Sequence, residues 1–238
     1  MSVGFSQWFS NIVYMFNLQH WQLFFQVGGL VGLLHGLLFT LEISLLGLLF
    51  ALILGVIFGV LATSQWKVMR AVARVYVEFF QNTPLMLQAI FIAFGLPIVW
   101  PAARHIPLFM VIVIAVSLYH GAYISEAVRA GIQSIHRGQL EASLSQGMTY
   151  VQAMRYVVIP QALRVVLPPL TNQAVNLIKN TSIGVAIGFA ELMYQAKMYS
   201  DMAATGPSFL LAALMYFILC FPLARLAKRL EDKAEVNN

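Results

Sequence analysis

Charged residues are what this sequence has least of. Only 10% of its 238 residues are Asp, Glu, Lys or Arg, while 60% are apolar and the mean hydropathy is +0.79. A soluble domain averages roughly one quarter charged residues. The composition therefore excludes an ordinary soluble domain and predicts an all-α membrane protein with about five transmembrane helices, because helices satisfy their own backbone hydrogen bonds in lipid.

Basic residues are absent before Lys67, and they then gather around positions 67–74, 129–164 and 225–233. Loops rich in Lys and Arg remain on the cytoplasmic side of a membrane. We therefore predict that the N-terminus lies outside and that the C-terminus lies in the cytoplasm. The same clusters account for the net charge of +5, so the charge gives no reason to expect a nucleic-acid partner.

Residues that carry catalysis or hold metals are also scarce. Cys220 is the single cysteine, and the five histidines lack the spacing of metal ligands. The phosphate-binding pattern GxxxxGK[ST] does not occur. We predict a protein that is not an enzyme, with no metal, cofactor or catalytic residue of its own. If ATP drives it, another subunit must bind the nucleotide.

The apolar runs divide the chain into segments long enough to cross a bilayer, which takes about 20 residues. They cover residues 37–62, 77–98, 107–129, 167–189 and 208–226. Pro84 should break the second segment near its start, whereas Gly55 and Gly59 allow close helix packing in the first. We expect residues 1–35 to form an interfacial helix (5–26) and lead-in, 36–230 the membrane domain, and 231–238 a cytoplasmic tail.

The polar stretch after position 138 interrupts these runs. Apolar residues recur there at helical spacing, at Leu140, Leu144, Met148 and Val151, which predicts an amphipathic helix over about 139–151 on the cytoplasmic side. Gly147 allows this helix to bend. The pattern alone leaves open whether the helix rests on lipid headgroups or fits a groove on another protein.

Spacing within this stretch carries a family resemblance. The sequence EASLSQG at 141–147, followed by VVIP at 157–160, resembles the EAA loop of membrane subunits of ABC importers. Ser143 is a mild departure, since alanine is common there. The segments RVYVEFFQNTPLMLQAIF (74–91), AYISEAVRAGIQSI (122–135) and NLIKNTSIGVAIG (176–188) are similar to the branch that takes up polar amino acids such as histidine, glutamine, glutamate and arginine.

The resemblance implies a type I ABC importer permease in the bacterial inner membrane. It implies that the EAA loop is a coupling helix, in which Glu141, Ala142, Ser143 and Gly147 contact the ATPase. The implied partners are two ABC ATPase subunits that bind ATP and Mg, a second permease subunit, identical or related, an extracytoplasmic amino-acid-binding protein, and membrane lipid. The implied substrate is a polar L-amino acid.

Polar residues inside the predicted spans are candidates for substrate contacts. Glu126 is the first, because a mid-membrane acid costs about 2.5 to 3.5 kcal/mol on insertion scales; it either receives a substrate amino group or pairs with Arg129. The other candidates are Gln173, Asn176 and Asn180, which share a helical face, and Thr83 beside Pro84. The alternative for these residues is packing against a second subunit.

The amide of Gln173 favours glutamine, glutamate or a similar substrate, since a cationic side chain would call for a carboxylate. Two other functions stay open. The first is an ion-coupled secondary transporter that uses Glu126, although no internal repeat supports it. The second is a membrane scaffold that transports nothing.

Overall fold

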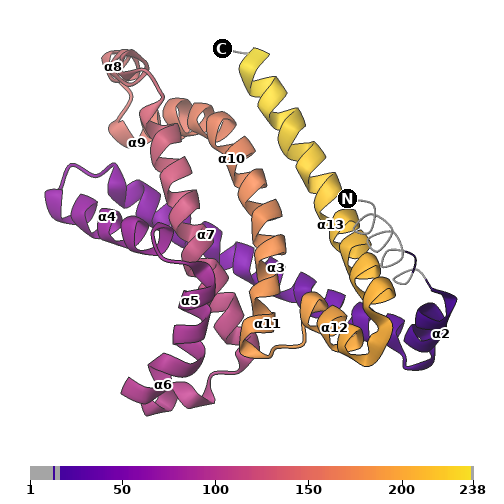
Figure 1. Cartoon of the computed structure of the whole chain (residues 1–238). Coiled ribbons are helices and arrows are strands. Elements are labelled where there is room, and N and C mark those ends of the chain that lie inside the picture. The colour runs from indigo at the N-terminus through magenta and orange to yellow at the C-terminus, as the bar shows by residue number, and fades with distance from the viewer. Residues whose placement is uncertain (1–12, 14–16, 237–238) are drawn as a thin grey trace, which may run out of the picture.

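Long helices make up the fold, as the sequence predicts (Figure 1). The structure is a computed structural model that describes residue 13 and residues 17–236, without the side chains of 203–204 and 233–236. All regular elements in these residues are helical. The short helices α8 (Arg137–Ser145) and α9 (Tyr150–Ala153) lie at one end of the molecule, while α6 (Leu96–Val99) and α12 (Leu192–Tyr199) lie at the other.

Within the described residues, three helices are long and apolar enough to cross a membrane, and they match three of the predicted spans. They are α3 (Gly29–Ala62), α7 (Leu108–Gln133) and α13 (Thr205–Val236), the last over its first 28 residues. A fourth crossing arises if α4 (Lys67–Gln81) and the segment Leu85–Val99 form one broken span, since their axes are bent by 99°.

The bend corrects the predicted second span. We expected a helix from 77 to 98, but position 77 lies inside α4, and a new helix, α5 (Leu85–Ile90), starts after Pro84. A π-helix, η1 (Phe91–Gly95), joins α5 to α6, and a 3-10 helix, η2 (Pro101–His105), follows. The break itself is confirmed, because Pro84 occupies the N-cap of α5 with φ −60°, where its missing N–H costs no helical bond.

The predicted fourth span is also shifted along the chain. Its helix, α10 (Ile159–Asn180), begins eight residues before position 167 and contains Pro168 and Pro169. Because of its polar side chains, α10 is not among the helices that are apolar enough to count as membrane spans. Beyond α10 lie η4 (Thr181–Ile183) and α11 (Gly184–Ile187), so the polypeptide turns at 181 rather than continuing to 189.

The predicted domain limits fall inside helices. α3 begins at Gly29 and crosses the limit at position 35, while α13 continues through the proposed tail to Val236. Asn172 Nδ2 donates to Glu231 Oε1 at 2.6 Å, which fastens that end of α13 to α10. Of the predicted interfacial helix, the structure shows α2 (Leu18–Gln26); residues 5–12 and 14–16 lie outside the described residues.

A buried carboxylate that the sequence did not single out fixes α12. Glu191 is fully buried and caps this helix, accepting hydrogen bonds from the backbone N–H of Met193 (2.7 Å) and Tyr194 (2.9 Å). Tyr216 Oη of α13 donates to the same carboxylate at 3.1 Å. These three hydrogen bonds satisfy the oxygens of the buried carboxyl group and tie α12 to α13. A π-helix, η5 (Ser200–Ala204), then leads into α13.

Packing of α3 against α7 forms the centre of the molecule, and small side chains make it possible. Of the small buried residues of α3, Gly47, Gly55 and Gly59 face α7, whereas Gly36 faces α12. The full set of buried positions is Gly29, Leu33, Gly36, Thr40, Ile43, Ser44, Gly47, Ala51, Gly55 and Gly59. A Cβ atom on Gly59 would lie 2.7 Å from Cβ of Val128, and one on Gly55 would overlap the Ile124 side chain. The predicted close packing at both glycines is confirmed.

We predict that Gly55→Leu destabilises the protein, whereas Val56→Leu does not. The first change forces a side chain into the α3–α7 contact, and overpacking of this kind costs about 1 to 3 kcal/mol. Val56 is 49% exposed and lies about 100° further around α3, outside the contact with α7, so the added methylene is accommodated outside that contact. Unfolding midpoints of the two detergent-solubilised variants should separate, and equal midpoints would contradict the packing described.

Candidate functional site

The predicted coupling segment is two short helices rather than one. Gly147 has φ +86° and ends α8, and α9 starts three residues later. A capping box starts α9: Thr149 N donates to Gln152 Oε1 at 2.9 Å, and Gln152 N donates to Thr149 Oγ1 at 3.3 Å. The single helix predicted over 139–151 is therefore wrong, because the left-handed conformation at Gly147 cannot continue it.

Side chains of this segment divide into an exposed set and one buried residue. Glu141 and Ala142 are exposed on α8, whereas Ser143 is buried and donates to the Gln139 carbonyl at 2.7 Å. Apolar residues are exposed beside them, with Leu144 at 42% and Val151 at 72%. The segment therefore presents an uncovered, partly apolar surface at one end of the molecule (Figure 1).

Helical backbone connects this surface directly to α10. α9 passes into the π-helix η3 (Met154–Val158), and η3 passes into α10, with Met154 and Ile159 both in right-handed helical conformation at the junctions. One continuous helical path therefore links α9 to the polar residues of α10.

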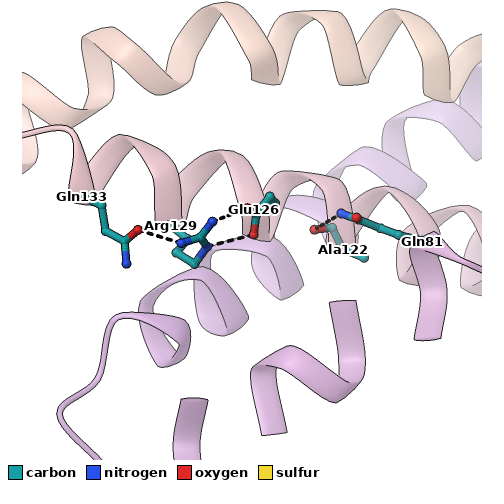
Figure 2. A network of polar contacts seen from close by, with 5 residues as sticks. All are labelled: Gln81, Ala122, Glu126, Arg129 and Gln133. Atoms are coloured by element: carbon teal, nitrogen blue, oxygen red, sulfur yellow. Dashed lines mark hydrogen bonds and ion pairs between the residues drawn. The ribbon is translucent and has the colours of Figure 1, made fainter. Parts of the chain in front are cut away.

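Glu126 pairs with Arg129 on α7, as one of the two alternatives from the sequence proposed. Figure 2 shows the pair: Arg129 Nε donates to Glu126 Oε2 at 2.9 Å, and Arg129 Nη2 contacts Oε1. Arg129 Nη1 also donates to Gln133 Oε1 at 2.6 Å. The Glu126 side chain nonetheless remains 45% exposed, so one side of the carboxylate is open.

The open side faces a cavity of about 500 Å³ between α4 and α7. Charged and amide side chains from both helices line it: Arg70, Arg74, Glu78 and Gln81 from α4, and Glu126, Arg129 and Gln133 from α7. Gln81 Nε2 donates to the Ala122 carbonyl at 3.3 Å, which holds the two helices together at this level (Figure 2). Sequence reasoning missed these α4 residues because it placed Arg70 and Arg74 in a cytoplasmic basic loop and began the second span at position 77.

Gln173 and Asn180 meet at His120. The His120 side chain is 1% exposed on α7, its Nδ1 lies 2.9 Å from Gln173 Oε1, and its Nε2 lies 3.0 Å from Asn180 Nδ2. Two predicted site residues are thus brought together by a residue that the sequence analysis set aside. A polar ring within an apolar run was the available signal, since such a group needs a partner.

Thr83 and Asn176 lie apart from these two groups. Thr83 Oγ1 donates to the Phe79 carbonyl at 2.8 Å and accepts from Gln88 Nε2 at 2.8 Å, so its hydroxyl is engaged within the chain. Asn176 is exposed on α10. The five predicted substrate residues therefore do not form one pocket in a single chain.

We predict that Glu126 and Arg129 are energetically coupled. Glu126→Gln and Arg129→Gln should each lower the free energy of unfolding, and the double variant should lose less than their sum by about 0.5 to 3 kcal/mol. The exposed pair Lys197–Asp201, 2.9 Å apart, is the matched control, with an expected coupling near zero. Denaturation of all variants measures both cycles, and additive losses at Glu126 and Arg129 would refute the coupling.

Two named relatives match most of this chain. It is 39% identical over 177 residues to the probable glutamine ABC transporter permease protein GlnM of Bacillus subtilis, which covers 74% of this chain and 81% of the relative. It is 36% identical over 166 residues to the glutamine transport system permease protein GlnP of Escherichia coli K12, covering 69% of this chain and 75% of the relative.

Solved structures agree with the fold. A crystal structure of an amino acid ABC transporter with histidines matches 87% of this chain and 96% of its own, at 32% identity and a TM-score of 0.77. The inward-facing MetNI methionine ABC transporter, at 19% identity, matches 83% of this chain and 95% of its own with a TM-score of 0.66, which concerns the fold alone.

The helical arrangement is therefore that of a type I ABC importer permease, as the sequence predicted. The exposed segment with Glu141 and Gly147 lies within residues 51–236, the part of the chain that matches the family model. By this match, the chain belongs to the family described as the binding-protein-dependent transport system inner membrane component.

Proposed function

We propose that this chain is the transmembrane subunit of an ABC importer for a polar L-amino acid, with glutamine or a similar amino acid as the substrate. One observation carries the proposal: the exposed α8–α9 segment continues through η3 into α10, the helix that carries Gln173 and Asn180. Relatives named as glutamine permeases at 36–39% identity support the substrate class.

In this proposal the subunit performs no covalent chemistry and binds no cofactor. Two partner ATPase subunits hold ATP and Mg, and grooves on their surfaces receive the α8–α9 segment. Exposed Glu141 offers a carboxylate to donors in such a groove, and exposed Ala142 allows close approach. ATP-driven closure of the ATPases then displaces α9 and, through η3, α10.

Orientation follows from the same assignment. We place α8, α9 and the basic end of α13 in the cytoplasm of a bacterial cell, and α6, α11 and α12 outside its inner membrane. An external binding protein delivers the amino acid to that outer end. A second permease subunit completes the substrate path, which agrees with the wide separation of the predicted site residues in one chain.

The rival ion-coupled mechanism is less well supported by the contacts of Glu126. A carboxylate that binds a proton or sodium ion in a transport cycle must become free of its partner. Glu126 is bonded through both oxygens to Arg129, so cation binding would first have to break that pair.

Reconstitution separates the three functions. The permease is placed in liposomes with its ATPase subunits and binding protein, and uptake of labelled glutamine is measured with ATP inside, with an ion gradient alone, and with neither. We expect uptake with ATP only. Uptake driven by the gradient alone would support the ion-coupled transporter, and an intact assembly that never transports would support the scaffold.

Substitutions at Gly147 test the coupling segment. Because its φ is +86°, Gly147→Asn should retain much of the ATP-driven uptake, whereas Gly147→Val should lose most of it. The expected cause is a misplaced α9, so ATP hydrolysis should continue without matching transport. The rates of hydrolysis and uptake are measured together, with Gln146→Val, an exposed neighbour, as the control. Normal uptake by Gly147→Val would exclude this role for the segment.

A further inference from the structure

His120 joins two amide side chains of α10 through the two nitrogens of one ring. Nδ1 contacts Gln173 Oε1 at 2.9 Å, and Nε2 contacts Asn180 Nδ2 at 3.0 Å. The ring itself is buried, with 1% exposed, whereas both amide side chains are partly exposed. The inner ends of the two amides are therefore held by the ring, and their outer ends are left for other groups.

One tautomer of the ring satisfies both contacts. An amide oxygen only accepts, so His120 Nδ1 must carry the proton that Gln173 Oε1 receives. An amide nitrogen donates, so His120 Nε2 must be the unprotonated acceptor for Asn180 Nδ2. Neutral imidazole has one N–H donor and one nitrogen acceptor, and these two contacts use both of them.

The ring thereby fixes the polarity of both outer ends. Gln173 turns its NH₂ group outward as a donor, and Asn180 turns its carbonyl oxygen outward as an acceptor. Rotating the Gln173 amide by half a turn would set its NH₂ group against Nδ1–H, leaving two donors in contact and a buried N–H unbonded. His120 thus opposes rotation of Gln173 alone, because reversing the amide also requires the ring proton to move to Nε2 and the Asn180 amide to rotate.

We propose that His120 is a positioning residue that sets substrate specificity by holding Gln173 as a hydrogen-bond donor. The site then takes L-amino acids whose side chain offers an oxygen acceptor and carries no positive charge, as glutamine does. The backbones of Gln173 and Asn180 stand about two turns apart on α10, and their amide ends converge on the one ring. A bound amino acid bridges the two outer ends, with its side-chain oxygen at Gln173 and its ammonium group at the Asn180 carbonyl.

The inference rests on the proposed function, and it differs from a purely structural role for His120. A structural role predicts that removing the ring weakens the fold, or the affinity for all ligands alike. Positioning predicts a change in the ratio of affinities. Without the ring nitrogens the Gln173 amide rotates freely, and it can offer its oxygen to a cationic side chain.

The test measures equilibrium binding of labelled glutamine and labelled arginine to the permease–ATPase complex in lipid nanodiscs, without the binding protein. Wild type should bind glutamine roughly tenfold more tightly than arginine, the ratio that one hydrogen bond supplies. His120→Phe keeps a ring of similar size and should bring the two affinities within about threefold of each other. Ser117→Ala is the control, since Ser117 is buried on α7 and bonds to the Gly47 carbonyl of α3 at 3.2 Å.

An unchanged ratio in His120→Phe, or a parallel loss for both ligands, would overturn the proposal. So would a wild-type complex that transports with ATP but binds neither amino acid. Wild-type uptake that fails with ATP would instead refute the proposed function, so the two failures are distinguishable.

A spectroscopic measurement covers the case in which His120→Phe does not fold. In the ¹⁵N-histidine-labelled wild-type protein, one ring should show a protonated Nδ1 and an unprotonated Nε2. That signal should shift in Gln173→Leu, which removes its acceptor. A ring at this site protonated at Nε2 would overturn the proposal, because Gln173 would then have to offer its oxygen outward.

Discussion

Contact between α3 and α7 through small side chains is the constraint on which the rest of the structure depends. α3 is apolar on all sides, so hydrophobicity does not determine which face it buries. Lipid is as apolar as leucine, and helix association in a membrane relies on close packing instead. Of the buried positions of α3, only Leu33 and Ile43 carry large side chains. Backbone approach along this face makes α7 the central helix.

Once α7 is central, its polar atoms find partners on the helices to either side. Tyr76 Oη of α4 donates to the Leu118 carbonyl at 2.8 Å, and Gln81 reaches the Ala122 carbonyl one turn further on. On another side, His120 reaches α10. These polar groups are paired inside the chain, which lowers the cost of placing them in the membrane. The cavity near Glu126 and the His120 network are consequences of this arrangement.

The sequence predicted the parts of this structure that depend on composition or local spacing. Runs of apolar residues located α3, α7 and α13, and the residue pattern around Glu141 identified the exposed segment. Gly55 and Gly59 indicated which face of α3 packs closely. The start of α10 was missed because Pro160, Gln161 and Arg164 interrupt the apolar run in its first turns. Hydropathy also could not separate α4 from the span after it. At Pro84 the helix axis changes direction, but the apolar content of the sequence does not change.

Contacts between distant residues were beyond the reach of the sequence. His120 lies 53 residues from Gln173 and 60 from Asn180, and no spacing rule connects them. The local Glu126–Arg129 pair, three residues apart, was open to prediction because helical geometry places such neighbours together. Sequence separation therefore limits which side-chain contacts can be predicted. The partners of a polar residue in one span can be named only when the helix that packs against it is known.

The helical path from the exposed α8–α9 segment to the His120 contacts is not equally stiff along its length. The π-helix η3 has wider turns than an α-helix, and Pro168 and Pro169 each remove a backbone donor inside α10. Both weak places lie between α9 and Gln173. Beyond them, α10 is fastened to α7 by His120 and to α13 by Asn172 and Glu231. A displacement of α9 therefore meets the two weakest parts of the helix before it reaches the bonded half, so bending at those parts requires less force than breaking the network.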